Sequence, residues 1–118
     1  MIFVVVEDRA FIAMIDQATK AEGAIHRYFQ NEDSLLKAFG EELPKLFLLD
    51  ITVTCLDGPT VVEKLKQNSL TRKVPLIVFG GSIRADLMQD ARELGADKVL
   101  PKASFREQLP ELIRHYVK

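Results

Sequence analysis

A short, wholly apolar run that ends in a carboxylate is the feature that most restricts how this chain can fold. Residues 46–49 read Leu-Phe-Leu-Leu, and Asp50 follows directly. A short apolar run bounded by turn-forming residues is typical of a strand buried on both faces, as at the centre of a parallel sheet. Because ligands bind beyond the carboxyl ends of such strands, Asp50 is the first candidate for a functional residue.

Similar runs alternate with amphipathic segments along the rest of the chain. The predicted strands cover residues 2–6, 24–29, 45–50, 74–79 and 98–100, and the predicted helices cover residues 9–22, 31–43, 59–68, 82–94 and 104–116. Strict alternation with short connections predicts parallel strands, right-handed crossovers and helices on both faces. The first, third and fourth strands are almost wholly apolar, whereas the weaker second and fifth suit the sheet edges. We therefore predict one α/β domain over residues 1–118, a doubly wound sheet with strand order 2-1-3-4-5 and five helices.

Turn and capping residues set the expected helix ends. Pro59 suits the first turn of the third helix, and Ser82 can cap the fourth. Pro110 falls inside the fifth helical pattern, where its ring would clash with the preceding turn. The sequence therefore predicts either a kink at Pro110 or a main helix that begins near Leu109.

Composition and charge argue against several classes of function. Hydrophobic residues make up 47% of the chain and charged residues 28%, which is typical of a soluble globular domain rather than a disordered segment. The net charge is −1, and acidic and basic residues are scattered along the chain, so the sequence has no basic cluster that would bind nucleic acid or an anionic membrane. Cys55 is the single cysteine and the apolar run 2–6 is too short to span a membrane, so we expect a cytoplasmic protein.

Acidic residues end two predicted strands that are neighbours in this strand order. Glu7 and Asp8 follow the first strand and Asp50 ends the third, so three carboxylates should cluster at one edge of the sheet. Such a cluster either raises a pKa or requires a cation, and carboxylate oxygens suit Mg²⁺. Lys102, after the last strand, adds a mobile positive charge for an anion. A carboxylate nucleophile, a metal site and a cation are the parts needed to transfer a phosphoryl group onto Asp50.

Several segments, in this order and spacing, are typical of one family. They are Val4-Val5-Val6-Glu7-Asp8, Leu48-Leu49-Asp50, Leu56-Asp57-Gly58, Val74-Pro75-Leu76-Ile77-Val78, Glu93-Leu94-Gly95-Ala96-Asp97 and Leu100-Pro101-Lys102. Each segment is a weak signal alone. Together they mean that the chain resembles the receiver domains of two-component response regulators over nearly its whole length.

The resemblance implies a flavodoxin-like fold and a set of site residues. Asp50 would be the phosphoacceptor, and Lys102 would contact the phosphoryl group. Mg²⁺ would be held by Glu7, Asp8, Asp50 and the backbone carbonyl of Thr52. The phosphoryl group would come from a sensor histidine kinase or a histidine phosphotransfer protein, and its transfer would switch a surface for an output partner protein. The chain would catalyse only its own phosphorylation and dephosphorylation, and would not otherwise be an enzyme.

Three positions depart from the usual pattern of that family. Gly80 ends the fourth strand where the family has Thr or Ser, whose hydroxyl bonds the phosphoryl group, and Ser82 could supply a substitute through a shifted loop. Val99 replaces an aromatic residue of the fifth strand, so both parts of the usual switch are missing. Ala103 replaces a proline, and because a cis bond without proline costs about 3–4 kcal/mol, we predict a trans bond there.

Two alternative functions compete with a phosphorylatable receiver. A pseudo-receiver would keep the fold and act as a phosphorylation-independent protein-interaction module; Gly80 and Val99 favour this alternative, and the intact acidic site opposes it. A Mg²⁺-dependent phosphohydrolase would need a second acid two residues after its nucleophile, where this chain has Thr52. The pair Gly80-Gly81 is open to two interpretations, simple flexibility or an opening for a partner.

Overall fold

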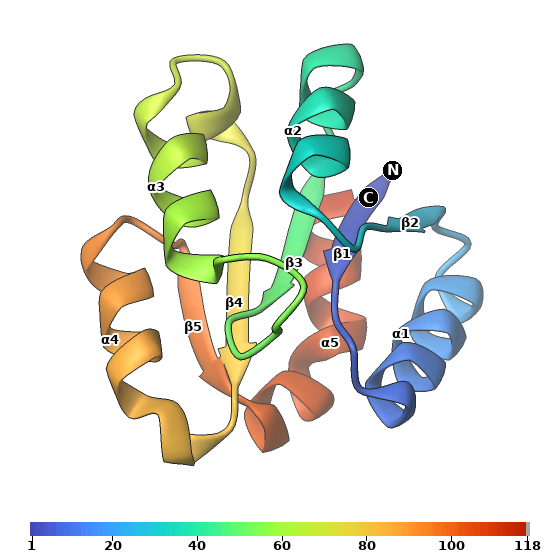
Figure 1. The fold of residues 1–118 in the computed structure, drawn as a ribbon. Helices are drawn as coiled ribbons and strands as arrows, with labels where there is room; N and C mark the ends of the chain where they lie inside the picture. The colour runs from blue at the N-terminus through green and yellow to red at the C-terminus, as the bar shows by residue number, and fades with distance from the viewer. Residues whose placement is uncertain (118) are drawn as a thin grey trace.

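The computed structural model describes residues 1–117, without the side chain of Ser82. Within that part of the chain, five strands form one parallel sheet in the order β2-β1-β3-β4-β5, which confirms the predicted order (Figure 1). The strands are β1 Ile2–Val5, β2 His26–Tyr28, β3 Leu46–Asp50, β4 Leu76–Gly80 and β5 Lys98–Pro101. The β1, β3 and β4 strands are buried throughout, whereas β2 and β5 are partly exposed, as expected for edge strands.

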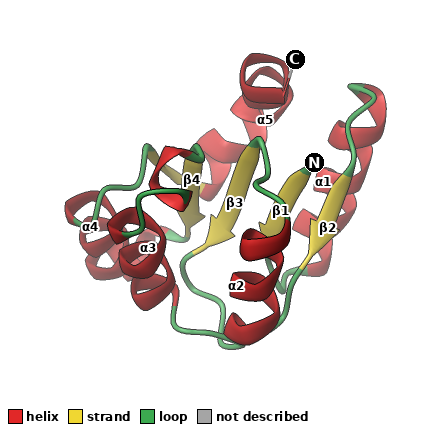
Figure 2. Cartoon of the chain, turned by 90° about the horizontal axis from the view of Figure 1, so that it is seen from above, coloured by secondary structure: helices red, strands yellow, loops and turns green. Residues whose placement is uncertain are grey.

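Five α-helices cover the two faces of the sheet within the described residues. They are α1 Arg9–Ala21, α2 Glu32–Glu41, α3 Gly58–Gln67, α4 Ala85–Glu93 and α5 Lys102–Val117. Two short 3-10 turns precede β4 and α4, at Thr71–Lys73 and Ser82–Arg84. Figure 2 shows α2, α3 and α4 on one side of the sheet and α1 and α5 on the other. The chain is therefore doubly wound, as its alternating pattern predicts.

The central strands are apolar at every position because each face of the sheet packs under a helical layer. Phe3, Phe47 and Val78 point into the core beneath α2, α3 and α4. Their chain neighbours Val4 and Leu48 point into the core beneath α1 and α5. Successive side chains of a strand alternate between its two faces, so a strand buried on both sides needs no polar position.

Short polar side chains cap the amino ends of three of the helices. Asp8 precedes α1 and its carboxylate accepts a hydrogen bond from the backbone N–H of Ala10 at 2.9 Å. Asn31 and Asp57 cap α2 and α3 in the same manner. Side-chain oxygens at this position satisfy backbone donors that have no partner inside the helix. Asp8 is thus both a predicted site residue and the cap of the helix that follows it.

Two helix boundaries differ from the sequence expectation. The α4 helix begins at Ala85, and Arg84 precedes it without a side-chain cap, so Ser82 does not hold the capping position. The α5 helix begins at Lys102 and runs through Pro110, so a main helix beginning near Leu109 is wrong. Phe105, on the first turns, is fully buried against the sheet, and this packing outweighs the hydrogen bond that Pro110 cannot donate.

Two further observations concern the whole described chain. Residues 1–117 contain no cis peptide bond, so the bond between Lys102 and Ala103 is trans, as predicted. None of the helices in this part of the chain combines the length and the apolar composition needed to cross a membrane.

Candidate functional site

The carboxyl ends of β1 and β3 bring the predicted acidic residues to the same edge of the sheet. The two strands are paired with Val5 opposite Leu49, so Asp8 and Asp50 follow neighbouring positions. Figure 1 shows α5 beginning directly after β5, and Lys102 is the first residue of that helix. Its Nζ lies 3.7 Å from Oδ2 of Asp8 and 4.0 Å from Oδ2 of Asp50. One ammonium group therefore bridges the two carboxylates.

The two oxygens of the Asp50 carboxylate have different surroundings. Asp50 is only 4% exposed. Oδ1 accepts a hydrogen bond from the backbone N–H of Thr52 at 2.9 Å and another from its hydroxyl at 2.6 Å. Oδ2 is the oxygen that faces Lys102. The carboxylate is therefore fixed in one orientation, with one oxygen held by the loop and the other directed toward the cation.

Glu7 is held by a different part of the same loop. Its carboxylate accepts a hydrogen bond from the backbone N–H of Thr54 at 2.7 Å and a second from the Thr54 hydroxyl at 3.0 Å. The backbone hydrogen bond is the main reason why the pKa of Glu7 lies below its ordinary value. Within residues 1–117, no three His, Cys, Asp or Glu side chains are placed to hold one metal ion together. Glu7 therefore adds a negative charge near the site but does not form a three-carboxylate cluster with Asp8 and Asp50 in this structure.

The end of β4 leaves little room for a side chain on Gly80. A Cβ atom there would lie 3.0 Å from Cγ2 of Ile51, 3.5 Å from Cγ2 of Thr52 and 3.6 Å from Sδ of Met88. A Cβ on Gly58, the first residue of α3, would lie 2.8 Å from Cδ1 of the same Ile51. The Ile51 side chain thus lies between two glycines. Sequence reasoning missed this packing, although both glycine positions were visible in the sequence.

Comparison with known proteins decides the family. Residues 2–114 match the response regulator receiver domain family. The chain belongs to that family. Among curated relatives, a DNA-binding transcriptional regulator NtrC from Proteus hauseri is 29% identical over 101 residues, which cover 86% of this chain and 21% of the regulator. A protein-glutamate methylesterase/protein-glutamine glutaminase from Cereibacter sphaeroides is 33% identical over 75 residues, covering 62% of this chain and 20% of that protein. The receiver spans about a fifth of the length of these relatives.

Solved structures of receiver domains have the same fold. A response regulator signal receiver domain from Bermanella marisrubri is 26% identical, with a TM-score of 0.82 over 99% of this chain and 97% of that one. The phosphorylated cyanobacterial phytochrome response regulator RcpA superimposes with a TM-score of 0.83 at 18% identity, covering 99% and 93% of the two chains. The receiver domain of a sensor histidine kinase from Pseudomonas aeruginosa, solved with magnesium in its active-site cleft, gives a TM-score of 0.79 at 16% identity, covering 98% and 96%.

The donor set of this receiver suits Mg²⁺. The ion is usually bound through one or two carboxylates, with waters and phosphate oxygens completing its coordination. Asp8 and Asp50 present such a pair, because their Oδ2 atoms already approach one shared positive charge. The chemistry and placement of these two residues therefore fit the ion that receiver domains bind.

The other chemically notable groups have structural surroundings. His26 Nε2 lies 2.6 Å from an oxygen of Asp16, which also accepts a hydrogen bond from the Tyr28 hydroxyl, and this network joins β2 to α1. The Tyr28 and His26 bonds lower the pKa of Asp16. Burial, followed by the charge of Glu7, raises the pKa of the Cys55 thiol, so the thiol stays protonated at neutral pH.

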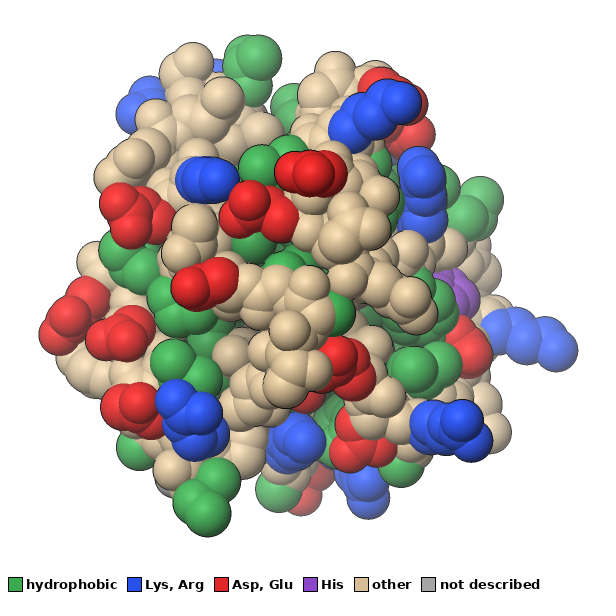
Figure 3. All heavy atoms as spheres, viewed as in Figure 1, with side chains coloured by type: hydrophobic (Ala, Val, Ile, Leu, Met, Phe, Trp, Pro, Cys, Tyr) green, Lys and Arg blue, Asp and Glu red, His purple; other side chains and the backbone are tan. Residues whose placement is uncertain are grey.

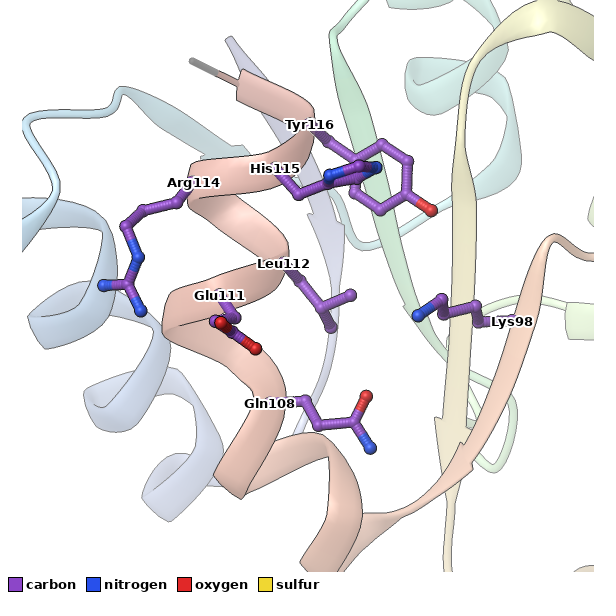
Figure 4. A pocket seen from close by; sticks show the side chains of 7 residues that line it. All are labelled: Lys98, Gln108, Glu111, Leu112, Arg114, His115 and Tyr116. Atoms are coloured by element: carbon purple, nitrogen blue, oxygen red, sulfur yellow. The ribbon is translucent and has the colours of Figure 1, made fainter.

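A separate cavity lies between α5 and the start of β5 (Figure 4). Its volume is about 490 Å³, and Lys98 and Leu112 are among the residues that line it. Lys98 is at the amino end of β5, whereas Asp50 is at the carboxyl end of β3, so the cavity opens at the opposite edge of the parallel sheet.

Figure 3 shows acidic and basic side chains interspersed over the front of the molecule, without a large patch of one sign.

Proposed function

We propose that this receiver accepts a phosphoryl group on Asp50 from a sensor histidine kinase or a histidine phosphotransfer protein, with Mg²⁺ bound beside it. The observation that carries the proposal is the bridging position of Lys102, whose Nζ is 3.7 Å from Asp8 and 4.0 Å from Asp50. A buried carboxylate next to a second carboxylate and a mobile cation is the arrangement that phosphoryl transfer to aspartate requires. Phosphorylation would then alter a surface recognised by an output partner protein.

Each residue of the site has a distinct task in this proposal. Asp8, Asp50 and the Thr52 carbonyl would hold Mg²⁺, which would supply positive charge to neutralise the carboxylates and the incoming phosphoryl oxygens. An oxygen of Asp50 attacks phosphorus while the bond from phosphorus to the donor nitrogen breaks, and that nitrogen keeps the electron pair. Lys102 moves from the two carboxylates to a phosphoryl oxygen, over the few ångströms that its flexible side chain can span. Glu7, held by Thr54, keeps a further negative charge near the metal.

The proposal is tested by measuring the intact mass of the protein after incubation with acetyl phosphate, with and without Mg²⁺. We expect a gain of about 80 Da that requires both Mg²⁺ and Asp50. Asp50→Asn is the matched control, because it keeps the shape of the side chain and removes its negative charge. A mass gain that persists in Asp50→Asn would place the phosphoryl group elsewhere and refute the assignment.

A specific observation favours one alternative, a pseudo-receiver that acts through protein contacts alone. Gly80 carries no switch hydroxyl, and Ile51 and Thr52 lie close to the point where its Cβ would be. Under this alternative the chain would show no mass gain and no heat of Mg²⁺ binding in a calorimetric titration. Mg²⁺ binding together with a mass gain would exclude it.

A further inference from the structure

The hydroxyl group that contacts Asp50 in this receiver comes from Thr52. Its Oγ1 donates to Oδ1 of Asp50 at 2.6 Å, and its backbone N–H donates to the same oxygen at 2.9 Å. We propose that this hydroxyl replaces the one absent at Gly80, bonding Asp50 before phosphoryl transfer and a phosphoryl oxygen after it. The inference rests on the proposed function and specifies how its site works.

The different surroundings of the two Asp50 oxygens indicate that Oδ1 is the nucleophile. Oδ2 shares the Lys102 ammonium with Oδ2 of Asp8, so these two oxygens are on the side where a divalent cation would replace that ammonium. An oxygen bound to the metal has its electron density drawn toward the ion. Oδ1, held only by hydrogen bonds from Thr52, is the oxygen left to attack phosphorus.

Transfer changes what the Thr52 donors can bind. When the new bond to phosphorus forms, Oδ1 becomes an ester oxygen and loses its share of the negative charge, while the phosphoryl oxygens attached to it carry that charge. Hydrogen bonds to charged oxygens are shorter and about twice as strong as those to neutral ones. The N–H and O–H of Thr52 therefore exchange Oδ1 for a phosphoryl oxygen, and both donors are already placed within bonding distance of the reacting atom.

The Thr52 side chain also connects the site to α4. Its Cγ2 lies 3.5 Å from the point where a Cβ of Gly80 would be, and Sδ of Met88 lies 3.6 Å from the same point. Thr52 and Met88 therefore border one small space above Gly80. Rotation of Thr52 about χ1, which redirects its hydroxyl, also moves its methyl group within this space. Met88, which is buried on α4, borders this space together with Ile51, so we expect the surroundings of Met88 to change when Thr52 rotates.

The experiment uses beryllofluoride with Mg²⁺ as a stand-in for the phosphoryl group, because its binding requires no turnover. Thr52→Val keeps the shape of the side chain and removes the hydroxyl, whereas Thr52→Ser keeps the hydroxyl. We expect Thr52→Val to weaken beryllofluoride binding about tenfold or more, the effect of losing a hydrogen bond to a charged group. Thr52→Ser should stay within about threefold of the wild type. Thr60→Val, the same change at the start of α3, should have no effect.

A second readout follows the methyl groups of the three methionines by NMR. The Met88 signal should shift when beryllofluoride binds to the wild type, and this shift should shrink in Thr52→Val. Met14, on α1, reports whether each variant is folded. Equal beryllofluoride affinity in Thr52→Val and wild type, or an equal loss in Thr52→Val and Thr52→Ser, would overturn the inference. Failure of the wild type itself to bind beryllofluoride would instead count against the proposed function.

Discussion

Restoring the family's usual threonine at Gly80 should destabilise this receiver. The change would place a Cβ 3.0 Å from Cγ2 of Ile51, where ordinary carbon contacts are about 3.5–4.0 Å, and would add two further atoms beyond it. On its other side Cδ1 of Ile51 lies close to Gly58, so a shift in that direction brings it nearer to the backbone of α3. Gly80→Thr therefore forces a shift of a side chain that is buried and confined at both ends.

The expected magnitude is the difference between two opposing effects. Overpacking of a close-packed core costs about 1–3 kcal/mol. Replacing glycine in a strand reduces the freedom of the unfolded chain, which offsets about 0.5–1 kcal/mol of that loss. We expect Gly80→Thr to lower the free energy of unfolding by about 1–2 kcal/mol. With a urea dependence of about 1–3 kcal/mol per molar for a domain of this size, the midpoint should fall by about 0.3–2 M.

Equilibrium urea denaturation, followed by circular dichroism, measures this difference. Gly81→Ala is the matched control, because a Cβ there meets no atom within 4 Å and the backbone is extended. That variant should be equal to or slightly more stable than the wild type. In an Ile51→Ala background the cost of Gly80→Thr should shrink, since the obstructing methyl group is gone. A Gly80→Thr variant as stable as the wild type would refute the packing argument.

Three further outcomes follow from charges and hydrogen bonds. The pKa of Glu7 is lowered in the folded protein, so its contribution to stability is present above the ordinary glutamate pKa and is lost as pH falls. Glu7→Gln should therefore make the free energy of unfolding depend less on pH in the acidic range, as measured by urea denaturation at several pH values. Cys55, whose pKa is raised by burial and by Glu7, should react slowly with iodoacetamide at pH 8, and faster in Glu7→Gln at equal stability. Lys66 is 12% exposed and donates to Asp97 Oδ2 at 2.9 Å, so Lys66→Met should lower the free energy of unfolding by about 1–3 kcal/mol, and an unchanged urea midpoint would contradict this.

The topology of this receiver could be predicted because it depends on patterns that are local in the sequence. Apolar runs of strand length show which strands are buried on both faces, and the strand order follows from which runs are weakest. The neighbourhood of Asp8, Asp50 and Lys102 then follows from that order, since parallel strands present their carboxyl ends at one edge.

The details that the sequence did not reveal depend on contacts between distant residues. The hydrogen bond between Glu7 and Thr54 joins positions far apart in the chain, and nothing in either segment indicates it. The α5 helix continues through Pro110 because burial of its apolar face outweighs the hydrogen bond that proline cannot donate. This burial depends on residues far away in the sequence, so the local pattern does not reveal it. The room beside Gly80 depends on the position of the Ile51 side chain, which lies in the loop after β3. Residue identity alone suggested flexibility or an opening for a partner at Gly80-Gly81, and it did not indicate the close approach of Ile51 to Gly80.

The buried charge of Asp50 and the hydroxyl that it receives from Thr52 argue for an altered switch rather than an abandoned one, even though Gly80 lacks the usual side chain. Loss of a side chain from a buried position leaves a cavity unless neighbours fill it, and here Ile51 and Thr52 border the space closely. Asp50 is almost completely buried beside the charge of Asp8, an arrangement that destabilises a folded chain unless a cation and hydrogen bonds compensate it. A chain without use for the carboxylate would be more stable with an apolar residue there. The same loop that borders Gly80 also supplies a hydroxyl to Asp50, so the residue next to the missing side chain is the one that keeps the acid hydrogen-bonded.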